Sequence, residues 1–171
     1  MALRAALVAP DRAWALVLVS APAPGVEPSA ELVALWEAEE AALARGDVDA
    51  AVDAVLGAWM LPEASPQLRE RVAAMQRRAF EAQGGEDPSA EAPDPAEEDP
   101  DVLRHLHVPA LVAVGERDKR DFLVGAEAMA RVLPAARHTV IAGAGHLAPL
   151  ETPEAFRALL LDFLAEHRPT V

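Results

Sequence analysis

Two polar residues occupy positions from which an acid–base pair could act. Asp118 follows the apolar run Pro109–Gly115 after a short turn. His146 follows the run Arg137–Ala142 after a glycine-rich segment. An aspartate can accept the Nδ1 proton of a histidine, which leaves the other ring nitrogen free to take a proton. Either residue alone is commonly a turn aspartate or a surface histidine. Because both follow predicted strands, we interpret Asp118 and His146 as a catalytic pair.

No nucleophile for this pair is evident in the sequence. The chain has no cysteine, and none of its serines lies in the G-x-S-x-G pattern of a strand-to-helix nucleophile turn. The serines are Ser20, Ser29, Ser65 and Ser89. Ser20 ends a predicted strand, and Ser65 precedes a proline in the manner of a helix cap. None of these serines is an evident nucleophile.

Three short runs predict the strands that position the pair. They are Trp14–Ser20, Pro109–Gly115 and Arg137–Ala142. The first two are apolar throughout most of their length, which is typical of buried strands in a parallel sheet. Helical patterns alternate with them, over Ala2–Val8, over Asp121–Leu133 and in a closing helix from Thr152. The alternation predicts an α/β fold with right-handed crossovers, in which functional residues gather beyond the carboxyl ends of the strands.

Between the first two predicted strands lie three amphipathic helices. Their apolar stripes contain Leu32, Leu35, Trp36 and Leu43, then Val48, Val52, Val55, Leu56 and Trp59, then Leu68, Val72, Met75 and Phe80. Asp47 can cap the second helix, and Gly84-Gly85 is expected to end the third. We interpret the region as a helical cap in which Trp36, Trp59 and Met60 contact an apolar substrate, although ordinary helix packing explains each of them as well.

The segment Glu81–Asp101 differs in composition from the rest of the chain. It contains nine carboxylates, four prolines and no Lys or Arg. Such a segment cannot bury enough apolar surface to offset its chain entropy, so we predict a mobile linker or a surface excursion. The chain then divides into a core segment (1–25), the helical cap (26–80), the acidic linker (81–101) and a second core segment (102–171) with the acid and histidine loops.

Composition excludes several classes of function. The 171 residues carry a net charge of −13, which would repel nucleic acid and anionic lipid. No apolar run approaches the ~20 residues that span a bilayer, so we expect a soluble protein, with cytoplasm as the default compartment, and no membrane partner. His105 and His107 form an H-x-H pattern without a third ligand, and the prolines within Asp94–Asp101 argue against a calcium loop. No metal is predicted.

These motifs carry a family resemblance. The segments Val108–Asp118, Val140–Leu147 and Glu151–Phe156 closely resemble the C-terminal part of an α/β-hydrolase. Asp11–Ser20 is similar to the strand that follows the nucleophile helix in this family, and Ser29–Phe80 looks like its helical cap. The resemblance implies a partial α/β-hydrolase fold, with about three parallel strands, flanking helices and a helical cap.

The resemblance also implies an activity. Family members use a Ser-Asp-His triad, here with Asp118 as the acid and His146 as the general base, and Leu147 beside them in contact with substrate. The substrate is expected to be a small apolar molecule with an ester, lactone or carbon–carbon bond to cleave, and no cofactor is implied. Met1–Leu7 looks like the continuation of the helix after the nucleophile turn, so we expect a C-terminal portion whose serine lies elsewhere. An aspartate nucleophile, as in the epoxide hydrolases and dehalogenases of this family, stays open.

The missing nucleophile leaves two hypotheses. The chain alone is expected to have little activity and an exposed sheet edge, which would pair with an N-terminal partner chain or with a second copy in a homodimer. Alternatively, the protein is a truncated, non-catalytic hydrolase remnant that serves as a binding module. An ester substrate and a fluorophosphonate probe separate these hypotheses, because a binding module neither hydrolyses the first nor reacts with the second.

Overall fold

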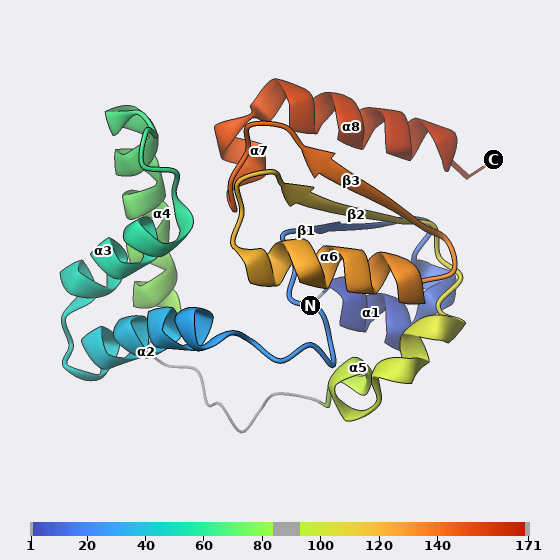
Figure 1. Cartoon of the computed structure of the whole chain (residues 1–171), viewed down its shortest axis with the longest axis horizontal. Helices are drawn as coiled ribbons and strands as arrows, with labels where there is room; N and C mark the ends of the chain where they lie inside the picture. The colour runs from blue at the N-terminus through green and yellow to red at the C-terminus, as the bar shows by residue number, and fades with distance from the viewer. Residues whose placement is uncertain (1, 84–92, 170–171) are drawn as a thin grey trace. The chain divides into compact units, whose positions relative to one another are not determined.

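The chain folds into two compact units, of which the computed structural model describes residues 2–83 and 93–169. The sheet unit consists of Met1–Glu27 and Pro93–Val171, and the helical unit consists of Pro28–Ala92 (Figure 1). The glycines predicted to end the third cap helix, Ser89 and the middle of the predicted linker lie outside the described residues.

Three parallel strands form the sheet, in the order β1-β2-β3. They are β1 (Leu16–Val19), β2 (Ala110–Gly115) and β3 (Ala136–Ile141). Ala110 of the central strand pairs with Leu16 on one side and with Ala136 on the other, so the carboxyl ends of the strands share one edge. Every residue of β2 is buried, as expected for a central parallel strand. The three predicted strands and their parallel arrangement are confirmed.

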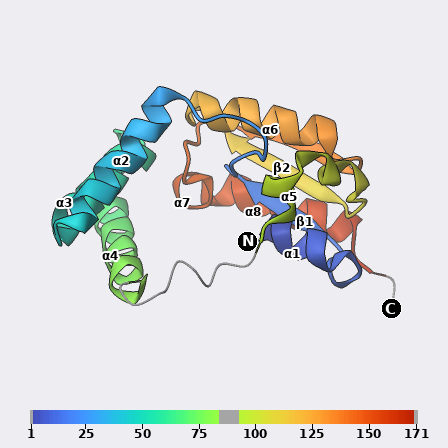
Figure 2. The same cartoon turned by 90° about the horizontal axis from the view of Figure 1, so that it is seen from below.

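Helices cover both faces of the sheet. Figures 1 and 2 show α8 (Pro153–Glu166) on one face and α6 (Arg120–Val132) on the other. Leu111 and Ala113 of β2 belong to the same core cluster as Phe163 of α8, because alternate strand residues point to the same face. The closing helix predicted from Thr152 is confirmed, and its residues Phe156, Leu159, Phe163 and Leu164 pack into this cluster.

The outer strands are less buried than β2, and β1 differs in this from the prediction of a strand buried on both faces. Leu16 and Leu18 of β1 are buried, whereas the residues between and after them are only partly buried. In β3 only Ile141 is buried, and Val140 is half exposed. The reason is position, because both strands lie at an edge of the described sheet and only β2 has a strand on each side.

Short helices complete the sheet unit. They are α1 (Ala2–Val8), η1 (Pro10–Arg12), α5 (Pro95–Glu98), η3 (Pro100–His105) and α7 (Ala148–Glu151). The predicted helix over Ala2–Val8 is confirmed, and it contacts β1 and α5. The sequence pattern did not predict α7, because a single turn that contains a proline carries no helical periodicity.

The structure also differs from the prediction of a linker over Glu81–Asp101, because the end of this segment is helical. Asp94 accepts a hydrogen bond from the backbone N–H of Ala96 at 3.0 Å, and Asp99 accepts one from that of Asp101 at 3.0 Å. These aspartates cap two helical turns that begin with prolines. Ala96 is buried. The helix caps at Asp94 and Asp99 therefore stabilise helical turns in residues whose composition alone predicted a linker.

The helical unit contains α2 (Ala30–Ala44), α3 (Val48–Trp59) and α4 (Pro66–Gln83). Each begins at a side-chain cap, because Ser29, Asp47 and Ser65 accept hydrogen bonds from the backbone N–H three residues further on. The predicted caps at Asp47 and Ser65 are therefore confirmed. Within residues 2–83 and 93–169, none of the helices is both long enough and apolar enough to cross a membrane.

The core of the helical unit is built around small residues. One buried cluster contains Ala42, Ala51, Val52, Val55 and Phe80, with Val48, Leu56 and Trp59 packed against them. The stripe predicted for α3 is confirmed, but those of α2 and α4 are corrected in part, because Trp36, Leu43 and Met75 are exposed. Alanine permits close approach between helices, so a pattern of large apolar residues identifies the buried face of α2 only in part, at Leu32.

Candidate active site

Asp118 lies in a tight turn just beyond β2. The turn is closed by a hydrogen bond from the backbone N–H of Asp118 to the carbonyl of Gly115, at 3.1 Å. The aspartate side chain has 0% of its surface exposed, and its Oδ1 accepts a hydrogen bond from the backbone N–H of Lys119 at 2.7 Å. A buried carboxylate needs such donors to replace its lost hydration. The turn therefore fixes where the carboxylate points.

His146 lies in the loop between β3 and α7, which passes directly over the end of β2. A Cβ atom on Gly115 would lie 2.1 Å from the carbonyl oxygen of Gly145 and 2.5 Å from that of Ala144, so this approach requires glycine. The backbone N–H of Arg117 donates to the carbonyl of Ala144 at 2.8 Å. The turn that contains Asp118 (the aspartate turn) and the loop that contains His146 (the histidine loop) are thus joined by a hydrogen bond between their backbones.

Two glutamates hold the backbone of the histidine loop. Oε2 of Glu116 accepts a hydrogen bond from the N–H of Gly143 at 2.9 Å, and Oε2 of Glu151 accepts one from that of Gly145 at 2.7 Å. Gly143 has a φ of 71°, in the left-handed region that favours glycine. Sequence reasoning missed both glutamates, because a glutamate in a turn or a short helix has no local pattern that distinguishes it from a surface charge.

The two loops bring Asp118 and His146 together. Nδ1 of His146 lies 3.0 Å from Oδ1 of Asp118 and 3.3 Å from Oδ2. The histidine side chain keeps 20% of its surface exposed, whereas the aspartate is fully shielded. The ring of Phe122 packs edge-on against the imidazole, with 4.4 Å between the ring centroids, which restricts the orientation of the imidazole. No sequence pattern had identified Phe122.

This arrangement is suited to taking and returning a proton. With the proton on Nδ1 donated to Asp118, the Nε2 atom of His146 is the ring nitrogen that can act as a base. A carboxylate removed from water stabilises the positive charge that develops on the ring. Bond formation needs a nucleophile and oxyanion donors in addition. Of the serines that the structure describes, Ser29 and Ser65 cap helices and Ser20 is buried at the end of β1.

The other predicted site residues are divided between the units. Leu147 follows His146 directly and is half-buried at the start of α7 in the sheet unit. The other three belong to the helical unit. Trp36 is exposed on α2, Trp59 packs against the helical core, and Met60 is the C-cap residue of α3.

The residues considered for metal binding have other surroundings. His105, at the end of η3, and His107 are both exposed. The side chains of Asp94 and Asp99 serve as helix caps. Among the residues that the structure describes, no group of three or more His, Asp or Glu side chains is arranged to hold a metal ion.

Solved hydrolases share this fold. An esterase from Thermogutta terrifontis matches with a TM-score of 0.69 and 26% identity, over 96% of this chain and 60% of the esterase. A hydrolase from Pseudomonas aeruginosa matches with a TM-score of 0.66 and 27% identity, over 94% of this chain and 58% of the hydrolase. MenH from S. aureus matches with a TM-score of 0.66 and 20% identity, over 91% of this chain and 60% of MenH. No protein-family model and no curated protein matches the sequence.

The chain spans about 60% of the length of these structures. The matched share of this chain is larger than the sheet unit alone, so the match includes residues of both units. The chain therefore has the fold of the C-terminal part of an α/β-hydrolase.

Proposed function

We propose that this chain supplies the acid and the base of an α/β-hydrolase that acts through a Ser-Asp-His triad. The observation that carries the proposal is the 3.0 Å contact between Nδ1 of His146 and the buried carboxylate of Asp118. The likeness to an esterase and to a hydrolase at 26% and 27% identity adds support. The proposed substrate is a small apolar molecule with an ester, lactone or carbon–carbon bond to cleave.

The reaction follows from the position of the two side chains. A serine outside the described residues attacks the substrate carbonyl, and Nε2 of His146 takes the hydroxyl proton. The imidazolium, stabilised by Asp118, returns this proton to the leaving group as the first bond breaks. A water molecule then attacks the acyl-serine, and His146 takes the water proton and passes it to the departing serine oxygen. Asp118 stays ionised throughout.

Substrate contacts are also part of the proposal. Leu147 is half-buried next to the proposed base, and an apolar side chain there suits an apolar acyl group. Trp36 presents an exposed indole on the helical unit, whereas Trp59 has packing partners of its own. We propose Leu147 as the substrate contact of the sheet unit, and Trp36, Trp59 and Met60 as those of the helical unit.

The test uses the native protein, purified from the cells that make it with any chain that accompanies it. It is treated with a fluorophosphonate and its intact mass is measured. The proposal predicts a labelled serine, either in a polypeptide heavier than 18.1 kDa or in an accompanying chain. It also predicts that His146→Ala lowers hydrolysis of p-nitrophenyl butyrate by about 10³-fold or more.

The exposed residue His105 supplies a matched control, because His105→Ala removes an imidazole outside the proposed site and should keep the wild-type rate. Wild-type hydrolysis by His146→Ala would contradict the assignment of the base. A native protein that neither reacts with the probe nor hydrolyses esters would contradict hydrolysis and favour a binding module.

A further inference from the structure

We propose that Glu151 is a positioning residue of the hydrolase reaction, one that determines where the base His146 lies. The inference rests on the proposed function, because it gives Glu151 a part in the proton transfers assigned to His146. Glu151 is the last residue of α7, and its Oε2 accepts a hydrogen bond from the N–H of Gly145 at 2.7 Å. Through this contact it acts on the base, without touching the substrate.

The peptide group between Ala144 and Gly145 is bonded at both ends. Its carbonyl oxygen, that of Ala144, accepts a hydrogen bond from the N–H of Arg117 at 2.8 Å. Its N–H, that of Gly145, donates to Glu151. Ala144 is fully buried, and a buried backbone group that loses its partner costs free energy. The peptide group is planar and rigid, so the two bonds together fix its orientation between the aspartate turn and α7.

Glu151 contacts the residues on both sides of His146. Its side chain accepts the N–H of Gly145, and its own backbone N–H donates to the carbonyl of Leu147 at 3.0 Å. The two bonds close a short ring of backbone that contains His146. They therefore restrict the backbone torsion angles of His146, which determine the direction of its Cα–Cβ bond.

Other contacts restrict the imidazole itself. Nδ1 lies 3.0 Å from Oδ1 of Asp118, and the ring of Phe122 packs at 4.4 Å between centroids. These contacts limit rotation of the ring but do not fix the Cα atom from which it projects. The proton transfers require Nε2 within hydrogen-bond reach of the nucleophile. A displacement of the base by about 1 Å is enough to lower the rate by up to about 10²-fold, so the position of the backbone matters.

The other glutamate at the histidine loop, Glu116, is less suited to this part. It accepts a hydrogen bond from the N–H of Gly143 at 2.9 Å, three residues before His146. Glu116 is exposed, so water competes for its carboxylate and for this bond. Glu151 is partly buried and bonds to the residue directly before His146. Of the two glutamates, Glu151 therefore has the stronger control over the base.

The contact depends on the reach of the side chain, which substitutions can separate from its charge. Glutamine offers an oxygen acceptor at the same reach as Glu151. Aspartate keeps the charge but is shorter by one carbon–carbon bond, about 1.5 Å. Glu151→Gln should therefore keep the histidine loop in place, whereas Glu151→Asp and Glu151→Ala should release it. A role of the negative charge alone predicts the reverse order for the glutamine and aspartate variants.

NMR on the 171-residue chain tests the positioning without any hydrolysis. The Nδ1 proton of His146 should exchange with water equally slowly in the wild type and in Glu151→Gln. In Glu151→Asp and Glu151→Ala it should exchange about tenfold faster or more. The amide signals of Leu111 and Val112, both buried in β2, should stay unchanged in all four proteins, which shows that the sheet is intact.

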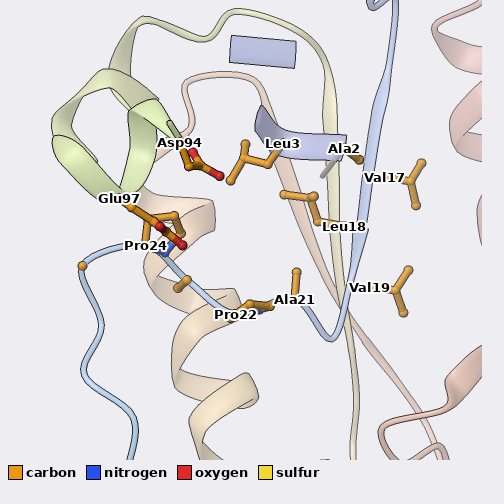
Figure 3. A pocket seen from close by; sticks show the side chains of 12 residues that line it. Ala2, Leu3, Val17, Leu18, Val19, Ala21, Pro22, Pro24, Asp94 and Glu97 are labelled. Atoms are coloured by element: carbon orange, nitrogen blue, oxygen red, sulfur yellow. The ribbon is translucent and has the colours of Figure 1, made fainter. Parts of the chain in front are cut away.

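Glu97 supplies a matched control in the same unit. It lines a pocket of about 540 Å³ together with Leu3 and Leu18 (Figure 3). Among the residues that the structure describes, none from the aspartate turn or the histidine loop lines this pocket. Glu97→Ala removes the same carboxylate away from the base, so exchange of the Nδ1 proton of His146 should remain as slow as in the wild type.

A second control separates positioning from general stability. Met129 is only 2% exposed, on the buried face of α6, and Met129→Ala leaves a cavity there. This variant should lower the urea midpoint of the sheet unit at least as much as Glu151→Ala does. It should nevertheless keep the slow exchange of the Nδ1 proton of His146, because it leaves the hydrogen bonds of the histidine loop in place.

Kinetics on the native protein, with any chain that accompanies it, test the consequence for the reaction. In Glu151→Ala and Glu151→Asp, kcat for p-nitrophenyl butyrate should fall by about 10- to 100-fold while KM changes by less than about threefold. The reason is that a displaced base weakens the transition state and not the binding of substrate. Glu151→Gln should stay within about threefold of the wild-type kcat, and Glu97→Ala should match the wild type.

Three results would overturn the positioning role. They are slow exchange of the Nδ1 proton of His146 in a folded Glu151→Asp or Glu151→Ala, loss of slow exchange in Glu151→Gln with retention in Glu151→Asp, and rapid exchange of the Gly145 amide in the wild-type chain. The last measurement decides even if the variants do not fold. A native protein that hydrolyses no ester, although the NMR order holds, would count against the proposed function and support the positioning of His146, so the two failures are distinguishable.

Discussion

Replacing Gly115 by alanine should disrupt the junction between the aspartate turn and the histidine loop. The added Cβ would lie 2.1, 2.5 and 2.8 Å from three backbone atoms of Ala144 and Gly145, where ordinary contacts begin at 3.4 Å. Backbone atoms cannot rotate away, so the loop must shift by about 1 Å. Overpacking of this kind costs about 1–3 kcal/mol, and strain on the bond between Arg117 and Ala144 adds about 1 kcal/mol. We therefore expect the free energy of unfolding to fall by about 2–4 kcal/mol.

Urea denaturation measures this change. Trp14 reports on the sheet unit once Trp36 and Trp59 are replaced by phenylalanine. The control is Gly143→Ala in the same loop, where the added Cβ meets no atom within 4 Å and only the positive φ is strained, at a cost of about 1–2 kcal/mol. The NMR signal of the hydrogen-bonded Nδ1 proton of His146 should be lost in Gly115→Ala and kept in the control. Equal costs for the two variants, with the signal intact in both, would refute the reasoning.

Three further substitutions test the packing around the site and in the helical unit. Glu151→Ala removes the carboxylate that accepts from Gly145 at 2.7 Å and should lower the stability of the sheet unit by about 1.5–3 kcal/mol in urea denaturation; an unchanged midpoint would count against this contact. Phe163→Ala empties the centre of the core on the α8 face and should cost about 3–5 kcal/mol in the same assay, whereas a loss below about 1 kcal/mol would contradict the packing described. Asp47→Ala removes the cap of α3 and should cost about 1 kcal/mol in thermal denaturation followed by circular dichroism, with the exposed mid-helix variant Asp53→Ala as the control that should show no such loss.

The sheet could be predicted because its strands are short, apolar and separated by helical periodicity. The caps at Asp47 and Ser65 were equally evident, since a cap depends on a few adjacent residues. The buried face of α2 could be predicted only in part, because Leu32 is buried as the pattern suggested but Ala42 is buried where the pattern suggested Trp36 and Leu43. The helical turns that Asp94 and Asp99 cap were hidden by an acidic, proline-rich composition.

The sequence predicted the main pair of the candidate site, but not the residues that hold this pair in place. Asp118 and His146 stand out because each follows a strand through a turn, and parallel strands bring such turns to one edge. Phe122 and Glu151 act through contacts that only the folded chain creates. Ser20 was interpreted only as the end of a strand, because a positive φ and a buried, unpartnered hydroxyl leave no trace in sequence.

The tautomer of His146 tests the central claim most directly, because it can be measured on the 171-residue chain without the nucleophile. Nitrogen-15 NMR of the imidazole distinguishes a ring protonated on Nδ1 from one protonated on Nε2. We predict that the single ring proton is on Nδ1, directed at Asp118, and that Nε2 carries none. Asp118→Asn should abolish this preference. A proton held on Nε2 in the wild-type chain, or a ring spectrum that Asp118→Asn leaves unchanged, would contradict the assignment of His146 as the base of a hydrolase.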